Sequence, residues 1–138
     1  MKKTIFWAFA LCFLAISCNK ETIEQVDDPI TVGPTDKELS TGTFSGNAHA
    51  TSGAVKLVEN ANKERRLIFE NFKTDAGPDL RIYLSSDLKA TSFTEVTDVI
   101  KNGNYQVAVP ATADLTKQKF VLIWCKQFSV LFGNAELK

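Results

Sequence analysis

Few side chains in this sequence could carry redox or metal chemistry. The only histidine is His49, and the three cysteines are Cys12, Cys18 and Cys125. A structural zinc site needs four Cys or His ligands, and a catalytic zinc site needs three protein ligands, commonly His. Neither set can be assembled here without carboxylates, so we expect no metal site.

Cys125 is the candidate for redox chemistry, and it would have to act as a single thiol. A mature chain that begins at an acylated Cys18, as argued below, has no second free cysteine for an internal disulfide. Three forms are then open: a sulfenic acid, a mixed disulfide with a redox protein partner, or a thiolate ligand to a metal or haem. In the last form the second ligand would be His49, the only imidazole.

Both residues also have an ordinary structural interpretation. Free cysteine is among the most often buried residue types and packs like a small hydrophobic side chain. Such packing is expected for Cys125, which ends the apolar run 120–125. His49 lies between two alanines on an expected strand, and a half-buried histidine is favoured there over a ligand. The sequence contains no Cys-x-x-Cys-His, Gly-x-Gly-x-x-Gly or phosphate-loop motif.

The N-terminus has the pattern of a secretory signal. Lys2 and Lys3 precede an unbroken apolar run of twelve residues, 5–16, which is shorter than the roughly 20 residues of a bilayer-spanning helix. Ser17 and Cys18 follow, and together with the run they resemble the bacterial lipoprotein signal, in which a small residue precedes an acylated cysteine. The resemblance implies cleavage before Cys18 and attachment to a membrane through lipid on its thiol.

The residues after Cys18 indicate in which membrane the anchored protein lies. In lipoproteins an aspartate directly after the acylated cysteine favours the inner membrane, and this chain has Asn19. The resemblance therefore implies the cell envelope and favours the outer membrane, with the protein facing the periplasm or the surface. Residues 19–40 hold six acids and two bases and lack hydrophobic periodicity. We expect residues 18–40 to be a lipidated cysteine and a flexible acidic tether.

The remainder of the chain has the alternation of β-strands. Residues 79–85 alternate apolar and polar side chains, and 120–125 is apolar on both faces, as in a central strand. Turn-forming Gly, Pro and Asn residues separate such runs. We predict that 41–138 folds by itself as an all-β domain, a single small antiparallel β-sandwich or barrel-like domain. At most one short helix is expected, near 93–100.

Charge and composition limit the partners. The chain has 138 residues, with 16 Lys plus Arg against 16 Asp plus Glu. This neutrality removes the usual electrostatic reason to bind nucleic acid, so we expect no nucleic-acid partner. Hydrophobic residues make up 44% of the chain, which suffices for a core.

Several short blocks over 41–138 have the spacing of the DM-thirteen domain. The most specific are Gly77-Pro78-Asp79 and Trp124-Cys125-Lys126, the latter followed by Phe128-Ser129. The other matching positions are Gly42 to Gly46, His49, Ser52-Gly53, Phe72, Asp75, Tyr83, Tyr105, Pro110 and Phe132 to Ala135. The resemblance implies a small extracytoplasmic β-domain with a proposed part in electron transfer, and it places the hallmark cysteine on Cys125.

The residues alone leave two classes of function open. Gly77-Pro78-Asp79 is most simply a turn that starts a strand, with a functional carboxylate at Asp79 as the other interpretation. Trp124 is expected to pack in the core and not to relay electrons. The first class is a membrane-anchored redox or electron-transfer accessory that acts through Cys125. The alternative is a non-catalytic binding or structural module of the envelope, in which that cysteine only packs.

Overall fold

The structure, a computed structural model, describes residues 22–138 as an all-β domain. The predicted signal peptide and Cys18 lie outside these residues. Ten strands are present: β1 (Gln25–Asp27), β2 (Lys37–Thr43), β3 (Ser45–Gly46), β4 (Thr51–Glu59), β5 (Arg65–Thr74), β6 (Leu80–Ser85), β7 (Phe93–Thr97), β8 (Asn102–Ala108), β9 (Phe120–Cys125) and β10 (Val130–Glu136). Among residues 22–138 there is no helix long and apolar enough to cross a membrane.

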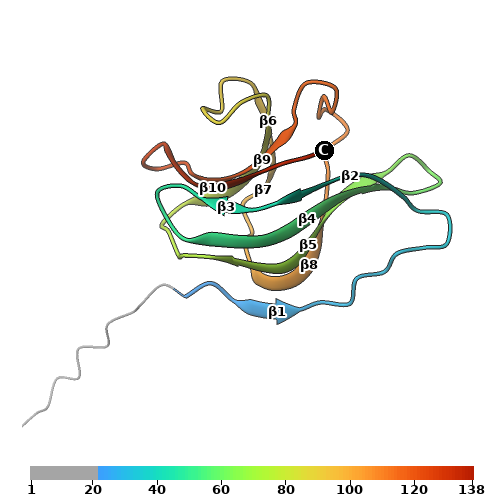
Figure 1. Cartoon of the computed structure of the whole chain (residues 1–138), viewed down its shortest axis with the longest axis horizontal. Coiled ribbons are helices and arrows are strands. Elements are labelled where there is room, and N and C mark those ends of the chain that lie inside the picture. Colours follow the sequence, from blue (N-terminus) through green and yellow to red (C-terminus); the bar gives the residue numbers. More distant parts are fainter. Residues whose placement is uncertain (1–21) are drawn as a thin grey trace, which may run out of the picture.

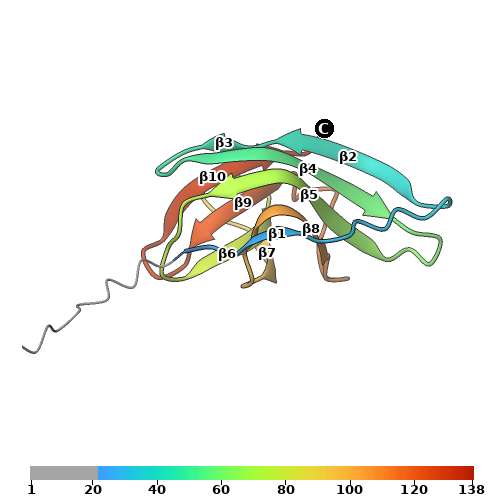
Figure 2. The same ribbon diagram turned by 90° about the horizontal axis from the view of Figure 1, so that it is seen from below.

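The strands form two five-stranded sheets that pack face to face (Figures 1 and 2). The first sheet has the order β1-β8-β5-β4-β2, and the second has the order β3-β10-β9-β6-β7. All pairs are antiparallel except β1 and β8. The prediction of an all-β domain is confirmed, and of the two architectures left open the structure is the sandwich.

Residues 93–100 do not form the short helical turn that the sequence allowed. Residues Phe93–Thr97 form β7, which pairs with β6 at the edge of the second sheet. The apolar spacing of this segment is close to helical, but Thr94, Val96 and Thr97 are β-branched. Such residues lose side-chain freedom in a helix and fit a pleated sheet, so pairing with β6 prevails.

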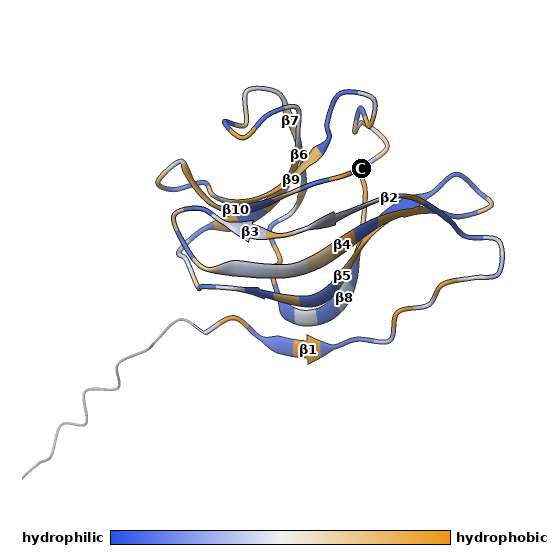
Figure 3. Ribbon diagram, in the orientation of Figure 1, coloured by the Kyte–Doolittle hydropathy of each residue, from blue (hydrophilic) through white to orange (hydrophobic). Residues whose placement is uncertain are grey.

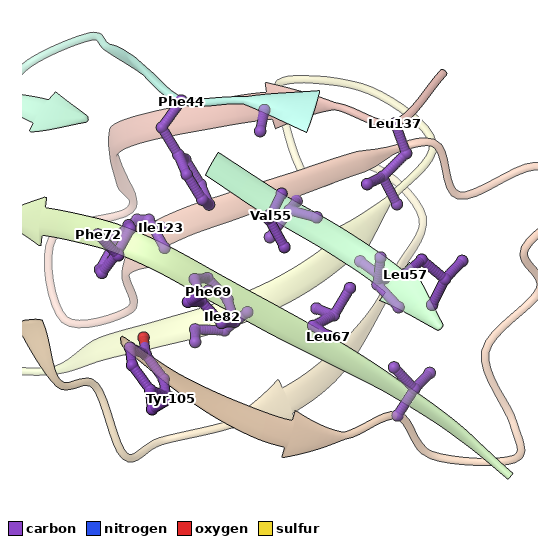
Figure 4. Close-up of a cluster of buried hydrophobic side chains, with 14 of the residues drawn as sticks. Phe44, Val55, Leu57, Leu67, Phe69, Phe72, Ile82, Tyr105, Ile123 and Leu137 are labelled. Atoms are coloured by element: carbon purple, nitrogen blue, oxygen red, sulfur yellow. The ribbon is translucent and has the colours of Figure 1, made fainter. Parts of the chain in front are cut away.

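The core lies between the two sheets, and Figure 4 shows it built from both of them. Phe69 of β5 is completely buried; its ring stacks on Tyr105 at a centroid distance of 4.7 Å and meets Phe72 edge to face at 5.2 Å. Val55, Ile82 and Ile123 belong to the same cluster. Figure 3 shows both apolar and polar segments along β5. Leu67, Phe69 and Phe72 of this strand belong to the core cluster, and a β-bulge lies between Phe69 and Phe72.

The folded domain starts earlier in the chain than residue 41. β2 begins at Lys37, and β1 lies within the segment predicted to be a flexible tether. Val26 of β1 and the preceding Ile23 pack against the core cluster. The parallel pairing of β1 with β8 brings the Val26 carbonyl so close to Gly103 that a Cβ there would overlap it. Three residues at a sheet edge are too few to show a period, which is why the sequence pattern missed β1.

Ion pairs fix the same segment on the domain. Asp28 binds Lys101 at 3.1 Å, and Asp36 binds Arg66. The backbone N–H of Gly33 and then Arg66 hold the pKa of the Asp36 carboxyl below its usual value. Residues 22–138 carry both sheets and the core cluster between them, so we expect this segment to fold without residues 1–21.

We expect residues 22–138 to unfold in one cooperative transition, and removal of 22–40 to lower the free energy of unfolding by about 2–4 kcal/mol. The loss combines the packing of Ile23 and Val26 with the pairing of β1 and of the first residues of β2. Urea unfolding of residues 22–138 and of residues 41–138, followed by circular dichroism, measures the difference in the free energy of unfolding. Equal midpoints would show that the segment is a dispensable tether, as the sequence suggested.

Candidate functional site

Cys125 is the last residue of β9 and is completely buried. Its strand neighbours are Leu80 in β6 and Val130 in β10. The side chain belongs to the core cluster between the sheets, together with Leu80 and Phe132. The thiol therefore lies at one end of the sandwich and has no contact with solvent.

The two most specific sequence blocks meet beside this cysteine. Pro78 and Asp79 form a turn directly before β6, as the sequence predicted. The backbone N–H of Lys126 donates to the Asp79 carbonyl at 2.9 Å, which holds this turn against the end of β9. The Asp79 carboxylate accepts from Arg81 Nε at 2.6 Å and, together with Glu95, raises the pKa of that arginine. Asp79 thus acts here as a structural carboxylate.

Gly77 allows a close approach over the same end of the core. A Cβ at this position would lie 2.8 Å from Phe132 Cζ and 2.9 Å from Leu80 Cδ2, distances that real side chains do not adopt. Phe132 lies at a β-bulge, where the register of β10 on β9 shifts between Leu131 and Gly133. Bulges redirect side chains and are common beside functional sites. The bulge is thus placed beside the strand that carries Cys125.

His49 lies next to this cluster but faces its outer side. It belongs to the loop of residues 47–50 between β3 and β4, not to a strand as predicted. Its ring stacks on Phe132 at a centroid distance of 3.8 Å, and Nδ1 lies 3.4 Å from Asp75 Oδ2. The side chain is 42% exposed. It is therefore an exposed histidine that pairs with Asp75, and not the half-buried one that the sequence favoured.

The residues present do not fit a haem held by Cys125 and His49. A haem needs open space beside the ligating sulfur, whereas the Cys125 side chain is sealed in the core. Neither residue lines one of the surface hollows described for this domain. Over residues 22–138, no group of three or more His, Cys, Asp or Glu side chains is placed to hold a metal ion.

Trp124 lies on the outer face of the second sheet and not in the core, where the sequence placed it. Neighbouring side chains on a strand point to opposite faces, so Trp124 points outward where Cys125 points inward. Its indole stacks on Tyr83 at a centroid distance of 6.3 Å, and Tyr83 stacks on Phe93 at 4.2 Å. The sequence did not predict this aromatic cluster. The alternation of Arg81 and Tyr83 with the core residues of β6 does indicate that Tyr83 lies on the outer face of that strand.

The fold and the cluster together define a class: a two-layered β-domain whose motif residues gather at one buried cysteine. The family model described as electron transfer DM13 matches residues 43–137. The chain belongs to this family, which confirms the resemblance seen in the motif blocks. No curated protein and no solved structure matches the chain.

Proposed function

We propose that this protein is a lipid-anchored electron-transfer accessory of the cell envelope, with Cys125 as its redox group. The observation that carries the proposal is the convergence of motif residues from distant segments on Cys125. Gly77 and Asp79 belong to the turn before β6 and Phe132 belongs to β10, and all three lie at the end of β9. Membership of a family described as electron transfer supports the same role.

The anchor rests on the sequence pattern that ends at Cys18. Six residues, 19–24, separate this cysteine from the start of β1. Even fully extended, they span at most about 20 Å. Lipid on Cys18 would therefore hold the domain next to the membrane, where it could meet a membrane-bound redox partner. The absence of aspartate at position 19 favours the outer membrane.

The redox step requires only one thiol. With a peroxide, the Cys125 thiolate attacks one peroxide oxygen, the O–O bond breaks, and sulfenic acid and an alcohol or water form. The sulfur loses two electrons, which the peroxide takes up. With a partner's disulfide, the thiolate forms a mixed disulfide and expels the other partner sulfur as a thiolate. Both reactions need the sulfur to be reached by its co-reactant.

Access to the sulfur requires local opening of the cover over Cys125. We place that cover at Leu80 and Phe132, which share the core cluster with Cys125, and at Gly77, where an added Cβ would lie 2.8 Å from Phe132 Cζ. The bulge at Phe132 interrupts the ladder of β10 beside it. We therefore expect local opening at this end of the sandwich to expose Cys125 before the rest of the domain unfolds.

A second candidate is a non-catalytic envelope module in which Cys125 only packs. The complete burial of the side chain favours it, since buried free cysteines in apolar surroundings are inert. The two candidates differ in whether the folded protein reacts at all.

Treatment of residues 22–138 with hydrogen peroxide or glutathione disulfide separates them, because Cys125 is the only cysteine in that segment. The redox role predicts one added oxygen or one glutathionyl group by intact mass, with the fold retained. The Cys125→Ser variant should show no added mass. The His49→Ala variant should be modified like wild type, because His49 pairs with Asp75 and not with the thiol. The packing role predicts an unmodified folded protein and a loss of about 1–3 kcal/mol in the serine variant.

A further inference from the structure

A hollow opens on the outer face of the second sheet, on the far side of β9 from the Cys125 side chain. Its volume is about 520 Å³, within the range of small-molecule sites in proteins. Strands β6, β7 and β9 form its floor, and the loop of residues 86–92 and the turn of residues 126–129 border it. We call it the aromatic hollow, after Tyr83, Phe93 and Trp124.

The three rings form one stacked platform. Tyr83 lies at the bottom, only 2% exposed, and Phe93 covers it at an interplanar angle of 17° with 45% of its own surface exposed. Trp124 lies on the other side of Tyr83 at 26°. Phe93 and Trp124 thus present ring surface to solvent on both sides of a fixed centre. A planar ring can add to such a platform by offset stacking.

The charged side chains that line the aromatic hollow are lysines only. Lys89 and Lys126 lie at its edge, and no carboxylate lines it. Glu95 approaches Lys126 Nζ at 3.8 Å and binds Arg81 at 2.8 Å, while Arg81 also binds Asp79. Asp87, near Lys89, accepts from the backbone N–H groups of Lys89 and Thr91. The lining therefore brings two ammonium groups beside apolar rings, and one of them, that of Lys126, also lies near Glu95.

Backbone conformation gives an independent indication of a built site. Ala90 and Ser129, which lie on opposite sides of the aromatic hollow, both have left-handed conformations, with φ of 53° and 52°. Residues with a Cβ adopt this region at a cost in free energy, and an alanine gains no local hydrogen bond from it. Such strain persists where the surrounding structure enforces it and is concentrated at ligand sites.

We propose that the aromatic hollow binds a planar aromatic anion, with its ring against Trp124 and its negative group between Lys89 and Lys126. A neutral sugar is disfavoured, because its hydroxyl groups need carboxylate or amide partners and the lining has neither. The proposal does not depend on the redox role of Cys125, since the two sites lie on opposite faces of β9.

Three probes separate the contributions of ring and charge: naphthalene-2-sulfonate, the uncharged 2-naphthol, and methanesulfonate, which has no ring. Trp124 is the only tryptophan in residues 22–138, so its fluorescence and its indole N–H resonance report binding directly. For naphthalene-2-sulfonate we expect a dissociation constant on the order of 1 mM or tighter. The amide shifts should be confined to β6, β7, β9 and the two bordering loops. The other two probes should bind at least about fivefold more weakly.

Variants test the assignment on the same domain. Trp124→Ala, followed by the NMR shifts, should weaken binding at least about tenfold, and Lys126→Met about fivefold. Lys37→Met removes the same charge from the exposed part of β2, far from the hollow along the chain, and should leave binding unchanged. Equal weakening by both lysine variants, shifts outside the hollow, or tighter binding of maltohexaose would overturn the proposal.

Discussion

Replacing Phe69 by alanine is expected to lower the free energy of unfolding of residues 22–138 by about 3–5 kcal/mol. Phe69 is completely buried, and its ring packs on Phe44, Phe72 and Tyr105 at centroid distances of 5.8, 5.2 and 4.7 Å. The truncation removes the ring that joins these three, and the surrounding strands cannot close the space. Urea unfolding followed by circular dichroism measures the change.

Two further variants serve as a milder substitution and as a control for the Phe69→Ala prediction. Phe69→Leu retains most of the side-chain volume and should cost about 1–2 kcal/mol, so it remains measurable if the alanine variant does not fold. Phe128→Ala makes the same truncation at a ring that is 63% exposed, and it should change stability by less than about 0.5 kcal/mol. Similar losses of stability in Phe69→Ala and Phe128→Ala would contradict the burial of Phe69 in the core.

Replacing Cys18 by serine is expected to release the protein from the membrane. The proposed anchor consists of several acyl chains attached at Cys18, and each CH₂ group buried in the membrane contributes about 0.8 kcal/mol to binding. Several chains together therefore hold a protein firmly on the membrane, and a protein without them loses this binding energy. In wild type, nearly all of the protein should sediment with the membrane fraction, and its N-terminal peptide should carry lipid by mass spectrometry. The serine variant should lack the lipid, and a much smaller share of it should sediment with the membrane fraction.

A matched variant separates lipid attachment from the leader sequence itself. Cys12→Ala changes the other N-terminal cysteine, which follows the bulky Leu11 instead of a small residue. It should leave the lipid, the cleavage and the membrane fraction as in wild type. The anchor would be refuted by a Cys18→Ser protein that is cleaved and sediments like wild type. Loss of the lipid in Cys12→Ala would instead place the modification on the wrong cysteine.

Period-two alternation was the reliable guide to the fold. Residues 79–85 and 120–125 lie in β6 and β9, and both are central strands of the second sheet. The pattern failed where an element is too short to have a period, as in β1, or where helical spacing competes with β-branched residues, as in β7. The first residues of β2 were missed because Lys37, Glu38 and Ser40 are polar, although they pair with β4.

The site was predictable in part. The turn before β6 and the burial of Cys125 follow from local sequence, because turn residues and an apolar run signal them. The contact of Gly77 with Phe132 and the stacking of His49 on Phe132 depend on the packing of segments far apart in the chain. No local pattern encodes them. The aromatic hollow was not predicted because Tyr83, Phe93 and Trp124 come from three strands, and no local pattern shows that their rings meet on the outer face of the second sheet.

We expect Cys125 to become reactive by local opening of its cover, without global unfolding. Labelling of the Cys125 thiol in residues 22–138 with an aromatic disulfide, at increasing urea below the unfolding transition, measures the free energy of exposure directly. We predict that this free energy depends weakly on urea and lies at least about 2 kcal/mol below that of global unfolding. An exposure free energy equal to the global value, with the same urea dependence, would contradict the account and leave Cys125 as a packing residue.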